Sequence, residues 1–419
     1  MGRFDYSGWR VLWEGLRGQR GWKQAWRSPD PKRGYDVVVI GGGGHGLATA
    51  YYLARTHGIR NVAVIEKGWL GGGNTGRNTT VVRSNYYYKE SASLYDLSLK
   101  LYEGLSRELN YNVMLSQRGM IMTAHSRHDL EAMANWTGAM RMNGVDARML
   151  SRTEVAQRVP ILDVSPGARF PVLGGCVQDR AGTARHDAVA WGYARAADRL
   201  GVDIIQQCEV TGFRRGSDGS ISGVETSRGF IRAPKVAMTV AGHSTMLADM
   251  AGFRLPVSSY ALQAFVTEPL KPVLDTCVLS LATGVYISQS DKGGLVIGGG
   301  LDLYPSFAQR GNMPVMRSVL GAVADQYPSL GRARLLRQWA GIVDVVPDSS
   351  PIIGETPVPG LYVNCGWGTG GFKAIPAGGT LLAHHIATGS PHPIAAPFSL
   401  ERFATGALID EAAASGIAH

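Results

Sequence analysis

A glycine-rich loop near the start of the chain constrains the fold more than any other feature. Residues 35–40 (YDVVVI) form a nearly continuous apolar run, which is typical of a strand buried in a parallel sheet. Gly41, Gly43 and Gly46 follow with the spacing GxGxxG, and residues 47–56 carry apolar side chains at helical spacing. Such glycines allow a tight turn, a close approach of the backbone to a pyrophosphate, and close packing of helix on strand. The pattern predicts a strand–loop–helix unit that binds a dinucleotide.

The next apolar run supports this interpretation. Residues 61–66 (NVAVIE) read as a second buried strand, and its last residue, Glu66, lies 20 residues after Gly46. An acidic residue at this place bonds the ribose hydroxyls of a dinucleotide. We therefore expect Glu66 to contact the cofactor, together with Gly44 and His45 of the loop. The alternative is a glycine-rich turn without a ligand.

A second glycine-rich loop lies near the other end of the chain. Residues 366–371 (GWGTGG) follow the apolar run 361–364 and precede a helix predicted from about Pro376. Backbone N–H groups in such a loop, and the helix N-terminus after it, can hold the electron-rich edge of a flavin ring. Two distant loops at one elongated cofactor favour FAD over NAD, because one compact unit usually suffices for NAD.

Charge and composition exclude several classes of protein. The net charge of +9 is concentrated in residues 1–33, so the body lacks the strongly basic surface of a nucleic-acid-binding protein. The longest apolar stretch, residues 37–54, is interrupted by glycines and is shorter than the ~20 residues of a membrane span. The N-terminus shows no secretory pattern, and the four cysteines form no CxxC pair. We expect a reducing, cytoplasmic location and no metal site.

Residues 1–33 form a basic arm that holds four of the nine tryptophans. Trp9, Trp13, Trp22 and Trp26 alternate there with arginine and lysine. Three interpretations remain open. The arm lies on its own protein, or it docks on a partner, since Trp and Arg are favoured interface anchors, or it forms a weakly membrane-bound helix.

The rest of the chain alternates between helical and strand-like segments. Residues 85–165 are predicted to be mostly helical. Further helices are predicted at residues 186–200 and 317–327, and strands at 202–210, 230–240 and, in antiparallel order, within 261–300.

Five segments resemble the β subunits of heterotetrameric sarcosine oxidases, which belong to the D-amino-acid-oxidase-like FAD amine oxidases. They are YDVVVIGGGGHG (35–46), WLGGGNTGRNTTVVRS (69–84), ARHDAVAW (184–191), WAGIVDVVPD (339–348) and NCGWGTGGFK (364–373). The resemblance runs from about Trp22 to His419, and the third and fifth segments are the most specific. It implies an α/β fold, with a Rossmann-like FAD-binding domain of the glutathione-reductase type and a substrate domain built on an antiparallel sheet.

This resemblance and the predicted elements divide the chain into four parts. We expect an arm (1–33), a discontinuous FAD-binding domain (34–90, 160–255 and 335–390), a substrate domain (91–159 and 256–334) and a C-terminal tail (391–419).

The resemblance also implies an activity and a set of partners. The expected reaction is oxidative N-demethylation of sarcosine to glycine by hydride transfer to FAD. Electrons then pass to a covalent FMN and to oxygen, with formation of H2O2. The carbon product is formaldehyde or, with tetrahydrofolate bound through the α subunit, methylene-tetrahydrofolate. The expected partners are the α, γ and δ subunits of a heterotetramer.

Particular residues match the family's substrate and FAD sites. Arg83 and Lys373 match cations that hold the substrate carboxylate, a task that suits Arg as a bidentate donor and Lys as a point charge. Tyr286 is expected to line the same pocket. For each cation the alternative is an ordinary surface ion pair. Residues expected at the FAD are Asn74, Thr75, Arg77, Thr80, Val210, Thr369, Gly371 and Lys373.

The second flavin is expected on His186, within the segment 184–191. An imidazole must be unprotonated to add to a flavin, so burial or a carboxylate partner should matter. Related single-chain enzymes attach FAD to a cysteine within the segment matching 340–343, where this chain has none, so FAD should be non-covalent. Val296 and Gly300 stand where those enzymes have a lysine and a histidine, which puts direct reaction of oxygen at the FAD in doubt.

Two other readings of the sequence stay open. The first is a self-sufficient FAD oxidase or dehydrogenase that acts on glycine, D-amino acids or another secondary amine. The second is a catalytically silent FAD-binding subunit, against which the presence of both Arg83 and Lys373 argues.

Overall fold

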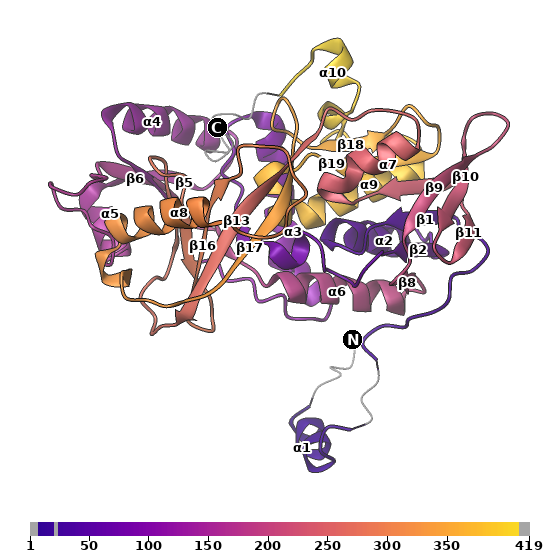
Figure 1. Cartoon of the computed structure of the whole chain (residues 1–419), viewed down its shortest axis with the longest axis horizontal. Coiled ribbons are helices and arrows are strands. Elements are labelled where there is room, and N and C mark those ends of the chain that lie inside the picture. The colour runs from indigo at the N-terminus through magenta and orange to yellow at the C-terminus, as the bar shows by residue number, and fades with distance from the viewer. Residues whose placement is uncertain (1–6, 21–23, 410–419) are drawn as a thin grey trace.

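The computed structural model describes residues 7–20 and 24–409. A six-stranded sheet forms the centre of one half of the molecule (Figure 1). Its strands are parallel except β18, which is antiparallel at one edge. The strand order is β18 (Ile352–Glu355), β19 (Leu361–Cys365), β12 (Lys235–Met238), β1 (Val37–Ile40), β2 (Val62–Ile65) and β8 (Asp203–Ile205).

Both faces of this sheet are covered, which explains its continuously apolar strands. On one face, Val37 and Val39 of β1 join a core with helices α2 (Gly44–Thr56), α3 (Lys89–Glu108), α6 (His186–Arg199) and α9 (Ile375–Thr388). On the other face, Val38 and Ile40 pack with a three-stranded sheet and α7 (Ser244–Met250). That small sheet is antiparallel and consists of β9 (Val210–Arg215), β10 (Ile221–Thr226) and β11 (Gly229–Arg232).

An eight-stranded sheet forms the other half of the molecule (Figure 1). Neighbouring strands are antiparallel except β14 and β4. Their order is β17 (Leu335–Val345), β13 (Ser258–Pro269), β16 (Gly294–Leu301), β15 (Tyr286–Gln289), β14 (Cys277–Ser280), β4 (Met120–Ala124), β6 (Gly174–Gln178) and β5 (Ala147–Ser151). Helices α4 (Arg127–Met142), α5 (Arg152–Arg158) and α8 (Met313–Gln326) pack against this sheet.

These sheets confirm the predicted α/β fold with a largely antiparallel second sheet, whereas three predicted elements were wrong in detail. The segment 202–210 is two strands, because Gln207 adopts a φ of 54° between them. The segment 230–240 divides at Pro234, which has no N–H to continue a ladder, so β11 and β12 enter different sheets. The segment 85–165 contains β4 and β5 as well as helices. The domain boundaries stay a prediction.

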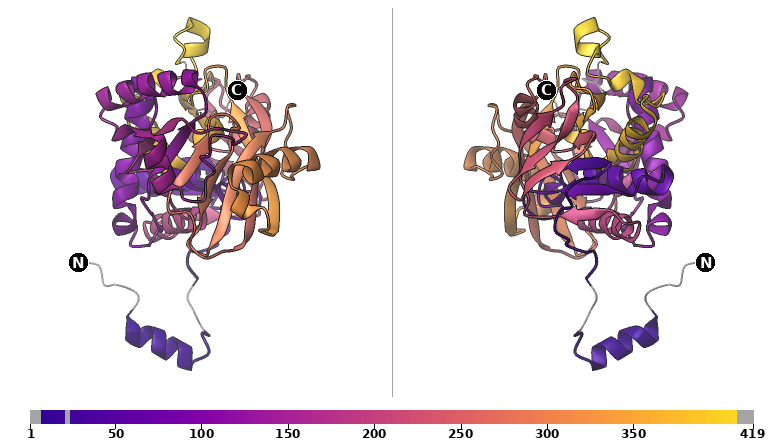
Figure 2. Two further views of the ribbon diagram at one scale, coloured as in Figure 1. Left: turned by 90° about the vertical axis from the view of Figure 1, so that its left-hand side faces the viewer. Right: turned by 90° about the vertical axis from the view of Figure 1, so that its right-hand side faces the viewer.

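The N-terminal arm divides into two parts. Its first part is helix α1 (Gly8–Leu16), which has no buried residue and stands apart from the body (Figure 2). Its second part lies on the body, where Trp26 packs against the core beside α2 and α6. Arg27 bonds Asp198 at 2.8 Å, and Lys32 pairs with the buried Asp203 at 2.8 Å. The interpretation that the arm lies on its own protein is therefore right for this second part and wrong for α1, and Trp22 falls outside the described residues.

The C-terminal segment is fixed to the body by a buried ion pair. Arg402, in α10 (Arg402–Thr405), donates two hydrogen bonds of 2.8 and 2.9 Å to the Asp348 carboxylate. Ile409 N–H donates a third at 3.0 Å. The predicted tail is thus docked as far as residue 409. Among the residues described, no helix combines the length and apolar character needed to cross a membrane.

Candidate functional site

A cavity of ≈ 580 Å³ lies between the two large sheets. Its walls include Ile40, Ile65 and Thr239, at the carboxyl ends of parallel strands where open α/β sheets bind their ligands. The eight-stranded sheet contributes residues of β13 and β17 to the opposite wall. Of the residues predicted at the FAD, the FMN or the substrate, all but Gly46, Thr80 and His186 line this cavity.

The first glycine loop has the geometry of a dinucleotide cradle. Gly41 has a φ of 108° and lies so close to Thr239 that a Cβ would stand 2.6 Å from its carbonyl oxygen. A Cβ on Gly46 would overlap the Gly41 carbonyl, so Gly46 is needed for helix packing rather than ligand contact. Gly43 has only Thr75 Oγ1 near its missing Cβ, at 3.2 Å. Space for a ligand therefore opens at Gly43, as the sequence predicts.

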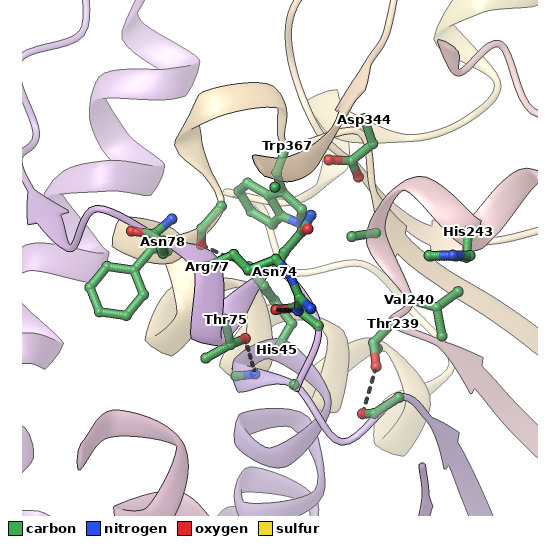
Figure 3. A pocket seen from close by; sticks show the side chains of 18 of the residues that line it. His45, Asn74, Thr75, Arg77, Asn78, Thr239, Val240, His243, Asp344 and Trp367 are labelled. Atoms are coloured by element: carbon green, nitrogen blue, oxygen red, sulfur yellow. Dashed lines mark hydrogen bonds between the residues drawn. The ribbon is translucent and has the colours of Figure 1, made fainter. Parts of the chain in front are cut away.

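Donors for a pyrophosphate and an acceptor for a ribose line this end of the cavity. The N-terminus of α2 faces it through Gly43, Gly44 and His45, and helix N-termini favour phosphate groups. Thr75 Oγ1 accepts a 3.0 Å hydrogen bond from the N–H of Gly44 (Figure 3). The Glu66 carboxylate accepts hydrogen bonds of 2.8 Å from the N–H groups of Gly42 and Gly68 and still borders the cavity. These residues fit the ribose and pyrophosphate of FAD.

His45 links the two glycine-rich loops. Burial lowers the pKa of its imidazole to about 4, so the ring is neutral at neutral pH. Its Nε2 lies 2.8 Å from the carbonyl oxygen of Gly371 and donates to it, and its ring stacks on Trp367 with centroids 4.7 Å apart. Two loops whose contacting residues are 326 positions apart in the chain thus touch directly beside the cavity.

The start of the second loop is held by a carboxylate that sequence reasoning missed. Asp344, at the end of β17, is buried and accepts a 2.6 Å hydrogen bond from Gly366 N–H. The N–H groups of Trp367 and Gly368 bond the same carboxylate. Burial nevertheless raises the pKa of Asp344 to about 6. N–H groups at the beginning of the loop are therefore occupied by Asp344, whereas Thr369, Gly371 and Lys373 line the cavity further along the loop.

Two buried basic side chains lie near each other in the cavity. Arg83 is 3% exposed and Lys373 is 5% exposed, and both line the cavity. Arg83 donates to the amide oxygen of Asn85 at 2.7 Å, and Lys373 Nζ donates to the carbonyl oxygen of Thr369 at 2.9 Å. Within residues 7–20 and 24–409, neither cation has an ion pair with an acidic side chain. Burial, and next the nearby charge of Arg83, lower the pKa of Lys373 well below its usual range.

Tyr286 is the third residue predicted in the substrate pocket. Its hydroxyl accepts a 3.1 Å hydrogen bond from Thr79 Oγ1, and the residue lines the same cavity as Arg83 and Lys373. Burial raises the pKa of this phenol, so it stays protonated and can donate to a ligand.

Three residues at this site were not found by sequence reasoning, namely Thr79, Asn85 and Asp344. For Asp344 the sequence did hold a signal. An aspartate inside an apolar run must find hydrogen-bond partners, because an unpaired carboxylate is costly to bury.

Four residues that the sequence singled out do not line this cavity, namely Thr80, His186, Val296 and Gly300. His186 begins α6, and burial lowers the pKa of its imidazole; its Nδ1 is buried without a hydrogen-bond partner in the described part of the chain. Asp187 does not orient the ring, since its carboxylate bonds Arg185 at 2.8 Å. Val296 and Gly300, on β16, are outside the cavity wall. Thr80, which adopts a φ of 70°, is also outside the cavity wall.

Comparisons with known proteins identify the family of this chain. The model of the FAD dependent oxidoreductase family matches residues 36–385. Sarcosine oxidase subunit beta of Rhodobacter capsulatus is 54% identical over 99% of both chains, and that of Rhizobium meliloti is 55% identical over 97% of both. Glycine oxidase of Geobacillus kaustophilus is 26% identical over 88% of this chain and 97% of its own.

A solved structure shares the whole fold. L-proline dehydrogenase from P. horikoshii superposes with a TM-score of 0.85 at 26% identity, over 90% of this chain and 100% of its own. The cavity with its glycine cradle, the family match and the identity to curated subunits lead to one assignment. The chain belongs to the FAD dependent oxidoreductase family and, within it, to the sarcosine oxidase β subunits.

Proposed function

We propose that this chain oxidises sarcosine to glycine, with Arg83 and Lys373 holding the substrate carboxylate. The observation that carries the proposal is the pair of buried basic side chains without an acidic partner among the described residues. A buried charge, such as that of an arginine, is normally paired, because an isolated charge is costly to remove from water. A bound carboxylate supplies the missing partner. Tyr286 lines the same cavity, and its protonated hydroxyl can donate a hydrogen bond to the substrate.

Lys373 also prepares the amine of the substrate. Sarcosine in water is a zwitterion, whereas loss of a hydride from the N-methyl carbon requires the lone pair of a neutral nitrogen. Burial lowers the pKa of Lys373, which favours the neutral form of its Nζ. A carboxylate beside Nζ favours the charged form instead. In its neutral form, Nζ can accept the proton of the substrate nitrogen when the carboxylate binds, and the total charge of the complex does not change.

The remaining residues of the cavity position the cofactor. Bound FAD supplies the hydride acceptor. Glu66 holds the ribose, the N-terminus of α2 holds the pyrophosphate, and the residues after Gly368 hold the flavin edge. We propose that this attachment is non-covalent, since no cysteine occurs within residues 340–343.

His186 is proposed to carry a covalent FMN at a boundary with another subunit. Its lowered pKa and unpaired Nδ1 suit a nucleophilic imidazole. Trp191, five residues further along α6, is 41% exposed, and Trp69, in the loop that packs beside α6, is 69% exposed. Exposed tryptophans are typical of subunit contacts. The proposed partners are the α, γ and δ subunits.

In this scheme electrons leave the FAD for the FMN and then for oxygen, with H2O2 as the reduced product. The methyl group leaves as formaldehyde, or as methylene-tetrahydrofolate formed on the α subunit. A cytoplasmic site of action is part of the proposal.

Anaerobic reduction of the bound flavin by sarcosine tests the substrate assignment without oxygen or FMN chemistry. Lys373→Met and Arg83→Gln should each raise the dissociation constant for sarcosine by about 10- to 150-fold, the value of one charge-assisted hydrogen bond. Lys67→Met removes a lysine from the other end of the same cavity and should leave this constant unchanged. Flavin absorbance of each variant confirms that FAD is bound. Unaltered constants in both site variants would contradict the proposal.

A further inference from the structure

Helix α1 presents an apolar stripe that nothing in the described chain covers. Trp9, Leu12, Trp13 and Leu16 are spaced i, i+3, i+4 and i+7, so they share one face. Their exposed fractions are 82%, 54%, 59% and 74%. The contacts recorded for the side chains of α1 stay within the arm, namely Arg10 with Glu14 and Arg17 over the ring of Trp13. An exposed stripe with this spacing is the signature of a helix that lies in a groove of a partner.

We infer that α1 is a docking helix whose apolar stripe inserts into a groove on another subunit of the sarcosine oxidase assembly. The comparisons favour this occupant. The FAD dependent oxidoreductase model begins only at residue 36, so the arm is not part of the shared fold. The relative from Rhodobacter capsulatus that is named a subunit nevertheless aligns over 99% of this chain, which includes α1. The alignment with a relative that is named as a subunit thus extends over the arm.

The charge and length of the arm define the groove. Arg10 and Arg17 border the stripe, and Arg20 follows it, so the groove should be apolar with an acidic rim. The arm is fixed to the body at Trp26 and Arg27, beside α6. Nine residues separate Leu16 from Trp26 and can span roughly 30 Å when extended. The groove therefore lies on a subunit that contacts the body near α6, the helix that begins at His186.

This inference rests on the proposed assembly with other subunits, but not on the proposed substrate or on the FMN. The full chain is co-expressed with the other sarcosine oxidase subunits of its organism, and the dissociation constant of the complex is measured by sedimentation over a dilution series. The variant Trp9→Ala/Trp13→Ala removes the two largest anchors. Val11→Ala is the matched control, because Val11 is 64% exposed on α1 but lies off the stripe.

The double variant should weaken assembly by about 30-fold or more, the usual cost of losing an aromatic hot spot, and Val11→Ala by less than about twofold. FAD content and anaerobic reduction by sarcosine should stay at the wild-type level in both, which shows that the body is folded. Equal dissociation constants for the double variant and the wild type would overturn the inference. So would an α1-dependent dimer of this chain, or α1-dependent sedimentation with phosphatidylcholine–phosphatidylglycerol vesicles. Failure of the wild-type chains to assemble would overturn both this inference and the proposed assembly, while leaving the substrate assignment intact.

Discussion

The carboxylate of Asp344 accepts a 2.6 Å hydrogen bond from the N–H of Gly366, and this contact fixes the start of the second glycine loop to the end of β17. The same loop continues to Thr369, whose carbonyl oxygen holds Lys373 Nζ. Asp344 is therefore connected through the backbone of this loop to Lys373, the residue proposed to bind the substrate carboxylate. Its burial makes the arrangement sensitive to pH.

Because of Asp344, the free energy of unfolding of the apoprotein should decrease as pH rises from about 4 to about 6. Burial raises its folded-state pKa to about 6, from 3.8 for the free group. The folded state thus binds the proton more tightly, and the free energy of unfolding decreases as pH rises through this window, by roughly 3 kcal/mol. Asp344→Asn removes the titrating group. Urea unfolding from pH 4 to 8 should show a flatter profile for the variant, and parallel profiles would contradict this account.

Two glycines of the first loop should separate cofactor binding from folding. Gly43→Ala places a methyl group where only Thr75 Oγ1 lies within reach, so the chain should fold but bind FAD at least about tenfold more weakly. Gly46→Ala drives a methyl group into the Gly41 carbonyl and should destabilise the apoprotein itself. Thermal unfolding without FAD, followed by flavin titration, distinguishes the two variants. A stable Gly46→Ala apoprotein would show that helix α2 adjusts more freely than this packing indicates.

The flavin on His186 should be lost in His186→Asn and retained in His128→Asn, a change at an exposed histidine. Acid precipitation of the assembled complex should leave flavin on the protein in the wild type and the control. In His186→Asn the pellet should be colourless, while FAD stays reducible by sarcosine and turnover with oxygen slows. Peptide mass mapping checks the position, and an adduct on another residue would show the assignment to be wrong.

Breaking the buried ion pair between Arg402 and Asp348 should lower the free energy of unfolding far more than breaking a surface pair. Arg402→Met leaves a carboxylate with 1% side-chain exposure without its cation, so the free energy of unfolding should fall by about 3–5 kcal/mol. Arg169→Met breaks a pair whose arginine is 73% exposed, and should change stability by less than about 1 kcal/mol. Denaturant unfolding of both variants gives the comparison. Equal losses would mean that the C-terminal segment is held by its other contacts.

The parts of the fold that local sequence determines could be predicted. The apolar run before Gly41 and the acidic end at Glu66 placed β1, α2 and β2, because neighbouring residues alone dictate a strand–loop–helix unit. Elements that depend on distant partners were missed. Strand β4 pairs in parallel with β14, more than 150 residues away in sequence, so its short apolar run inside a helical region gave no local sign of pairing.

Site residues that belong to sequence motifs could be predicted, whereas contacts that depend on tertiary packing could not. Gly43, Glu66 and Lys373 were found from their motifs and line one cavity. The contact between His45 and Gly371 joins residues that are 326 positions apart in the chain, so it depends on tertiary packing alone. The role of Asp344 could not be assigned from sequence, since an aspartate in an apolar strand gives no indication of which N–H groups it meets.

The central claim is that the two buried basic side chains, Arg83 and Lys373, bind a carboxylate. Methoxyacetate tests it most directly, because this probe carries the carboxylate of the substrate but no ionisable nitrogen. Burial favours the neutral form of Lys373 and a bound anion favours its charged form, so binding of the anion should raise the pKa of Lys373. Between the free and the bound pKa values, binding is then accompanied by uptake of a proton at Nζ. Calorimetry of the FAD-loaded chain over a series of pH values, each in two buffers of different ionisation enthalpy, measures that uptake. The account predicts a pH range in which binding takes up a proton and affinity falls as pH rises, with both effects absent in Lys373→Met; binding without proton uptake at any pH at which the chain is folded, or equal uptake in the variant, would contradict it.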